Sequence, residues 1–138
     1  MPYSYWIDLE REVVFSRIWG TLTDEHAAAH ATGLKDDPRF DAEFNQILDL
    51  RDLTDLQVTN AGIRRVAHLV PFRPDARRAF VVGTGQAEAL SRILFAYTDE
   101  GIDQYTLFRA LEPAMEWVGL DPKTPWPGHA PDKTFGAD

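Results

Sequence analysis

Cysteine is absent from the sequence. This absence excludes disulfide bonds, thiolate nucleophiles, zinc ribbons and iron–sulfur ligation by thiolates, and it fits a reducing compartment. Long apolar runs are absent as well: no stretch approaches the roughly 20 residues of a membrane span. The first residues, MPYSYWIDLEREV, show no signal-peptide pattern. We therefore expect a protein that is either free in the cytoplasm or peripheral to a membrane.

Basic residues are few, because 14 Lys and Arg stand against 22 Asp and Glu, a formal net charge of −8. Contacts to phosphates need Lys and Arg, so this balance argues against nucleic acid as a partner. The one basic segment covers residues 57–83, with five arginines against a single acidic residue. It is either a solvated face that pairs with acidic neighbours or a surface for an anion or an acidic partner.

Strand and helix patterns alternate along a chain whose 138 residues suit one domain with a sizeable core. Residues 3–10 and 13–20 are rich in aromatic and β-branched residues and predict an antiparallel hairpin. Thr23 and Gly33 are typical of the start and end of a first helix. Further strands are predicted at 46–50, 77–83 and 104–108, with helices from Thr59, over 85–101 and over 110–119.

This order predicts an α/β fold with a mostly parallel central sheet, an antiparallel hairpin at its N-terminal edge and helices packed on the sheet. Residues 1–120 would form the domain. Residues 121–138 contain four prolines and no periodicity, and they predict an extended tail. Trp126 and Phe135 of this tail either pack back on the domain or remain free for a partner.

The layout resembles the SpoIIAA-like (STAS) superfamily, which includes bacterial anti-sigma factor antagonists and the cytoplasmic domain of sulfate transporters. The similarity is carried by RIWGTLTDEH, FNQILDLRDLTDLQVT, RRAFVVG and TLFRALEPAMEWVG, and it covers about residues 1–120. The chain is most similar to the small stand-alone bacterial SpoIIAA-like proteins. For these, the resemblance implies a sandwich fold and either the binding of a small or apolar ligand or association with a membrane surface.

The resemblance also points to the segment QVTNAG, residues 57–62. In the antagonists a phosphorylated serine lies after the central strand, and here Thr59 is the nearest hydroxyl, without the Asp-Ser pair of that motif. From the residues alone, Thr59 is either a helix cap or a modified or anion-contacting hydroxyl. Asn60 lies beside it, and Arg64 and Arg65 follow one turn later within reach of an anion.

Two phenylalanines extend this candidate binding region. Phe72 sits in a proline-bounded loop among arginines, and Phe95 lies off the apolar stripe of its helix beside Arg92. Exposed aromatic residues beside basic ones can form a membrane-surface or ligand-entry patch. The predicted binding residues are therefore Thr59, Asn60, Arg64, Arg65, Phe72 and Phe95.

Patterns for catalysis, metals and cofactors are weak. Asp49 and Asp52 bracket a strand end and are more typical of a turn than of a paired-carboxylate site. His26 and His30 share a helix face by spacing but have no evident third metal ligand. The glycines of VVGTGQAEAL lack the rest of a dinucleotide or P-loop motif. We predict no catalytic residue, no metal and no cofactor.

The sequence therefore predicts a non-catalytic binding or regulatory module for a small or apolar ligand or a membrane surface. The alternative is a protein–protein signalling module of the antagonist type, switched near Thr59. An unidentified enzyme comes third. A homodimer through an edge strand or an exposed helix face is compatible with the sequence.

Overall fold

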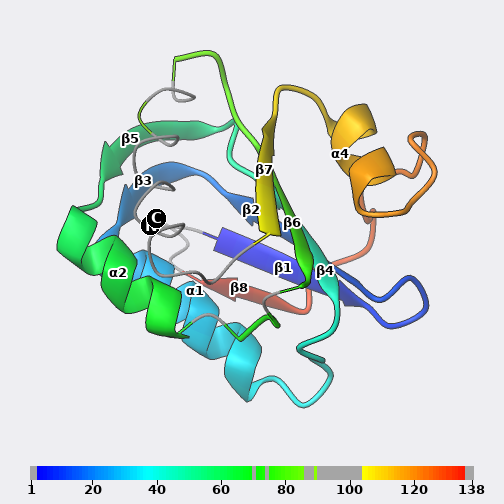
Figure 1. Ribbon diagram of the computed structural model, residues 1–138, viewed down its shortest axis with the longest axis horizontal. Coiled ribbons are helices and arrows are strands. Elements are labelled where there is room, and N and C mark those ends of the chain that lie inside the picture. Colours follow the sequence, from blue (N-terminus) through cyan, green and yellow to red (C-terminus); the bar gives the residue numbers. More distant parts are fainter. Residues whose placement is uncertain (1–2, 70, 74, 86–88, 90–103, 136–138) are drawn as a thin grey trace.

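The computed structural model describes residues 3–69, 71–73, 75–85, 89 and 104–135 of the chain. Within this part, a six-stranded sheet has the order β7-β6-β4-β2-β1-β8, and helices cover both of its faces (Figure 1). The strands are β1 (Tyr3–Asp8), β2 (Val13–Ile18), β4 (Asn45–Asp49), β6 (Arg77–Val81), β7 (Gln104–Phe108) and β8 (Lys133–Phe135).

Most strand pairs of this sheet are parallel. The pairs β2–β4, β4–β6 and β6–β7 are parallel, and only β1 runs antiparallel to both of its neighbours. The predicted α/β fold with a mostly parallel sheet is therefore confirmed. The prediction that the hairpin forms the edge is wrong, because β8 of the tail pairs with β1 from Tyr3↔Phe135 to Tyr5↔Lys133. Strand β8 therefore pairs with backbone groups of β1 that would stay unpaired if β1 were the edge strand.

A second, two-stranded sheet was not predicted. It consists of β3 (Gly20–Thr23) and β5 (Leu53–Gln57), which run parallel to each other. Gly20 has a φ of 75°, a left-handed conformation that glycine adopts readily, and it lies at the turn from β2 into β3. The two helices α1 (Asp24–Asp36) and α2 (Asn60–Leu69) begin shortly after β3 and β5. Their N-terminal ends are thereby brought close together.

The helices enclose two separate cores. On one face of the sheet, α1 and α2 pack against Tyr5, Leu48 and Phe80. On the other face, the short helix α4 (Leu111–Trp117) and part of the tail pack against β2, β4 and β6. Helix α1 runs three residues beyond its predicted end at Gly33. The predicted helix over 85–101, which contains Phe95, lies almost entirely outside the described residues.

The C-terminal segment packs back on the domain, which decides between the two alternatives for Trp126, whereas the side chain of Phe135 lies outside the described part of the chain. The Trp126 ring lies edge-on to Trp6 and Phe15, with centroid distances of 5.7 and 5.3 Å. The Trp6 indole N–H donates to the carbonyl of His129 at 2.9 Å. The segment from residue 121 to β8 therefore forms a strap across the face that carries α4. None of the helices in the described ranges combines the length and apolar character of a membrane span.

Candidate functional site

Thr59 joins the N-terminal ends of α1 and α2. Its Oγ1 accepts a hydrogen bond from the Gly62 N–H at 2.9 Å, which confirms the predicted helix cap. The Thr59 hydroxyl in turn donates to Asp24 Oδ2 at 2.7 Å, and the Thr59 N–H donates to Asp24 Oδ1 at 2.9 Å. Asp24 is the first residue of α1, where a negative charge is favourable. The same carboxylate therefore stabilises the N-terminus of α1 and binds Thr59 at the N-terminus of α2.

This geometry bears directly on the anion-binding interpretation of Thr59. The carboxylate of Asp24 already occupies the position where an anion would meet the N-terminus of α2. A phosphate on Thr59 would face that carboxylate and would have to displace it, because like charges repel. Asn60, Arg64 and Arg65 are exposed on α2, as a contact surface requires. Phosphorylation of Thr59 stays a prediction.

The predicted exposure of Phe72 is wrong. Its side chain is 6% exposed, and its ring meets the Phe40 ring edge-on at 5.0 Å. The Arg78 guanidinium lies 5.1 Å from the Phe72 ring centroid. Phe72 turns inward because it fills the core beside β6 and the end of α2. Among large hydrophobic side chains in the described part of the chain, only Leu9 is exposed, at 58%, so the aromatic patch finds no support there.

The two strand-end aspartates differ in their surroundings. Asp49 is buried and accepts two hydrogen bonds at 3.0 Å from the Arg51 guanidinium. The Nε of Arg17 also lies 3.8 Å from Asp49 Oδ2. Asp52 is exposed in the turn that follows. The carboxylate of Asp49 is therefore engaged by arginine at the strand end, as expected for a structural role.

A buried polar network lies between the sheet and α1, and the sequence interpretation missed it. His30 Nε2 lies 3.1 Å from Ser16 Oγ, Gln46 donates to the same Oγ at 3.2 Å, and Arg78 donates to Gln46 at 3.0 Å. Gln46 and Arg78 are register partners on β4 and β6. The signal was present, since Ser16, Gln46 and Arg78 each interrupt an apolar strand face. His26 instead bonds to Thr23 at 2.8 Å, and no metal-binding cluster occurs among the described residues.

His30 is expected to make stability depend on pH. Burial, reinforced by the charge of Arg78, lowers the pKa of His30 from 6.5 to about 3. In the unfolded chain this histidine takes up a proton near pH 6.5, so protons favour the unfolded state between pH 6.5 and 3. The free energy of unfolding should therefore be about 3 kcal/mol lower at pH 4 than at neutral pH. Denaturant titrations at several pH values measure it.

The matched pair for this experiment is His30→Gln and His26→Gln. The first should flatten the stability profile between pH 4 and 7, because the titrating group has been removed. The second should leave most of the slope, since the His26 ring is only partly buried. An unchanged slope in His30→Gln would contradict the assignment.

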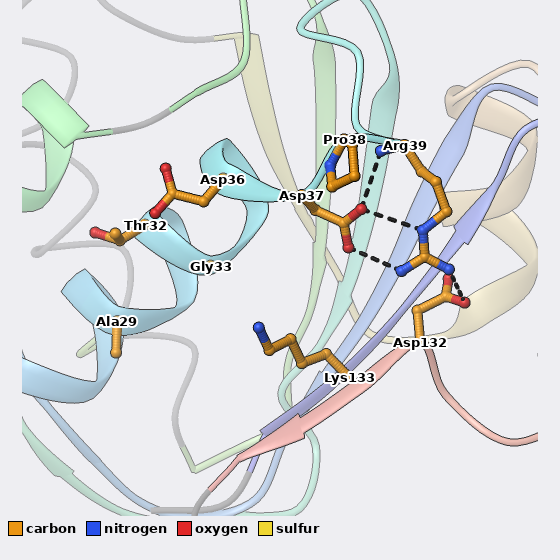
Figure 2. Close-up of a pocket in the computed structure, with 9 residues that line it drawn as sticks. All are labelled: Ala29, Thr32, Gly33, Asp36, Asp37, Pro38, Arg39, Asp132 and Lys133. Atoms are coloured by element: carbon orange, nitrogen blue, oxygen red, sulfur yellow. Dashed lines mark hydrogen bonds and ion pairs between the residues drawn. The ribbon is translucent and has the colours of Figure 1, made fainter.

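An open pocket of about 570 Å³ lies between α1 and β8, and its lining includes none of the residues predicted for binding. We call it the α1–β8 groove. Its α1 wall consists of residues at helical spacing, and Figure 2 shows Lys133 extending from the strand into the space opposite them. The lining residues are Ala29, Thr32, Gly33, Asp36, Asp37, Pro38, Arg39, Asp132 and Lys133.

An arginine clamp closes one end of the groove. The Arg39 guanidinium donates to both carboxylate oxygens of Asp37, at 3.1 and 2.9 Å, and to Asp132 at 2.6 Å (Figure 2). The hydrogen bonds from Arg39 lower the pKa of Asp37 to about 2. Tyr5 also donates to Asp37, and the Ile7 N–H donates to Asp132. Because Asp132 directly precedes β8, the clamp fixes this strand relative to the end of α1.

No family model matches the chain, and neither a curated protein nor a solved structure matches it.

Proposed function

We propose that the protein is a non-catalytic binding module that takes up an extended segment of a partner protein in the α1–β8 groove. One observation carries the proposal: the last strand of the six-stranded sheet faces a helix wall across an open pocket. In the described part of the chain no further strand pairs with the outer side of β8. A segment bound on that side would extend the sheet by one strand through main-chain hydrogen bonds.

The helix wall suits a close approach of another backbone. Ala29, Thr32 and Gly33 have small side chains and lie at helical spacing on the surface of α1 that lines the groove. A bulky side chain at these positions would fill the space that an added strand needs. The volume of about 570 Å³ also lies in the range of binding pockets, roughly 300 to 1,000 Å³. The strand β8 would supply main-chain hydrogen bonds to the bound segment, and the helix α1 would supply side-chain contacts.

The geometry of the other candidate sites makes them less suitable for binding or catalysis than the groove. Ser16 and His30 have the separation of a nucleophile and a base, but both are buried. The low pKa of His30 also makes it a weak base at neutral pH. At the alternative signalling site, Asp24 engages the Thr59 hydroxyl. The groove, in contrast, is open to solvent.

Filling the groove is expected to abolish binding. Full-length protein is used to select binders from a displayed library of random decapeptides. The selected peptides should lose at least tenfold in affinity for the Ala29→Trp variant, because indole occupies the space of the added strand. Amide signals of residues 29–36 and 133–135 should shift when such a peptide is titrated into labelled protein.

The matched control is Ala61→Trp, which places the same side chain at an exposed position of α2. It should leave the affinity unchanged. Selected peptides that bind Ala29→Trp as well as wild type, or a selection without binders, would overturn the proposal. Concentration-dependent dimerisation that is lost in Ala29→Trp would identify a second copy of the chain as the occupant.

A small anionic ligand is the second candidate, because another pocket of about 450 Å³ lies between the C-terminal ends of α1 and α2. Lys35 and His68 line it together with Phe40 and Leu69. This wall offers apolar contact beside the positive charge of Lys35. Signal shifts around Phe40 and Leu69, rather than along β8, during titration with a fatty acid would favour this candidate.

We also propose that the domain belongs to the SpoIIAA-like (STAS) superfamily. The support is the run of elements from β1 to β4, with the hairpin, the helix after it and the parallel pairing of β2 with β4. This assignment does not determine the ligand, since one fold serves many functions.

A further inference from the structure

We infer that Arg17 anchors a second binding site, which takes the carboxylate group of a small monocarboxylic acid. The site lies on the strap side of the sheet, where Arg17 of β2 and Asp49 of β4 are register partners near the carboxyl ends of two parallel strands. Ligands of α/β folds bind at such strand ends. The inference is independent of the proposed function, because neither residue lines the α1–β8 groove.

The guanidinium of Arg17 has unused hydrogen-bond donors. Its Nε lies 3.8 Å from Asp49 Oδ2, which is too long for a hydrogen bond, and this nitrogen is buried without an acceptor among the described residues. The two terminal nitrogens are not buried, and they too donate to none of these residues. The side chain as a whole is 37% exposed. A ligand can therefore reach the terminal nitrogens from solvent.

The orientation of this guanidinium is fixed before a ligand binds. Its central carbon lies over the Trp126 ring, 5.0 Å from the ring centroid, so the strap covers one face of the group. The group is planar, and its terminal nitrogens offer two parallel N–H bonds, which is the geometry that a carboxylate accepts. Because the side chain is already ordered, it loses less conformational freedom on binding.

The charges around Arg17 leave it as the surplus cation. Arg51 donates to both oxygens of Asp49 at 3.0 Å, so this buried carboxylate is neutralised without Arg17. The hydrogen bonds to Asp49, followed by the charges of Asp49 and Asp52, raise the pKa of Arg51. Asp52 brings the sum of these charges to zero, but it is exposed, and water screens its charge. The site therefore suits a single negative charge better than a double one.

A pair of hydroxyl groups lies on the other side of Arg17. Ser4 of β1 is the register partner of Arg17, and its Oγ lies 2.9 Å from Oγ1 of Thr134 on β8. One hydroxyl of the pair donates to the other, which leaves one O–H as a donor. The pair adds hydrogen-bonding capacity beside the guanidinium and no charge. A carboxylate at Arg17 would thus lie between polar groups on both neighbouring strands.

The test is an NMR titration of the full-length protein with sodium acetate, at an ionic strength held constant with sodium chloride. The Nε–Hε signal of Arg17 and the amide signals of residues 16–18 and 49–51 should shift and reach saturation. Arg17→Lys should weaken acetate binding at least about fivefold. The ammonium group keeps a positive charge beside Asp49, but it cannot stack flat on Trp126 or bind a carboxylate through two parallel bonds.

The matched control is Arg11→Lys, at an exposed arginine of the hairpin turn that pairs with Asp8. It should leave acetate binding unchanged. Shifts at Arg17 that do not saturate, or equal acetate binding by wild type and Arg17→Lys, would overturn the inference. Tighter binding of sulfate than of acetate would overturn the assignment of the ligand as a monocarboxylate. Ala29→Trp should bind acetate as wild type does, so the two proposals fail separately.

Discussion

Replacing Gly62 by alanine is expected to lower the free energy of unfolding by about 2 to 3 kcal/mol. A Cβ built on Gly62 would overlap the carboxyl group of Asp24. That carboxyl group cannot move away without losing its bonds to Thr59. The substitution should therefore combine steric overlap with the loss of a helix cap, each of which destabilises by about 1 kcal/mol or more. Urea unfolding followed by circular dichroism measures the change.

A double-mutant cycle separates this mechanism from the ordinary effect of alanine in a helix. Asp24→Ala alone should lower stability by about 1 to 2 kcal/mol, because it leaves the Thr59 N–H and hydroxyl without their partner. In that background Gly62→Ala should stabilise the protein by about 0.5 to 1 kcal/mol, since alanine is the better helix former. The sign of the Gly62 substitution thus reverses with the residue at position 24.

Glu25→Ala provides the control for the loss of a negative charge in the first turn of α1, and it should change stability by less than about 0.5 kcal/mol. Additive effects of Asp24→Ala and Gly62→Ala would contradict the overlap. They would mean that the two helix N-termini do not depend on one another through this carboxylate.

The contact between Thr59 and Asp24 illustrates what the sequence can and cannot predict. The role of Thr59 as a cap was predictable, because a hydroxyl and the N–H three residues later are neighbours in any helix. The role of Asp24 was not, because it lies 35 residues away and meets Thr59 only through the pairing of β3 with β5. Both strands are short, and the exposed residues of β5 give it no apolar alternation.

The layers of the fold were predictable because β4 and β6 are nearly continuous apolar runs and α2 has a clear apolar stripe. Phe72 was misjudged because a loop bounded by prolines has no period, so its sequence does not indicate which side chain turns inward. The groove was missed for a related reason. The spacing of Ala29, Thr32, Gly33 and Asp36 places them on one helix face, but no sequence pattern says that a strand as short as β8 lies opposite.

Trp126 is expected to contribute strongly to stability although it lies in the proline-rich strap. Trp126→Ala should lower the free energy of unfolding by about 3 kcal/mol, since it removes ring contacts with Trp6 and Phe15 and leaves a cavity. The Arg17 guanidinium, 5.0 Å from the ring centroid, would also lose its aromatic partner. Because the strap leads into β8, backbone amides of β8 should exchange faster with solvent in this variant.

Two further substitutions make this prediction specific. Leu9→Ala, at an exposed site of the hairpin turn, should change stability by less than about 0.5 kcal/mol. Trp126→Phe should lower the free energy of unfolding by less than about 1 kcal/mol. It keeps an aromatic ring and removes the indole N–H, which is buried without an acceptor among the described residues.

If Trp126→Ala accelerated exchange in β8 but left global unfolding unchanged, the strap would be a separate unit and Trp126 would not belong to the core. Equal losses for the Phe and Ala variants would instead mean that the indole N–H has a partner, and that its hydrogen bond rather than ring packing holds the strap.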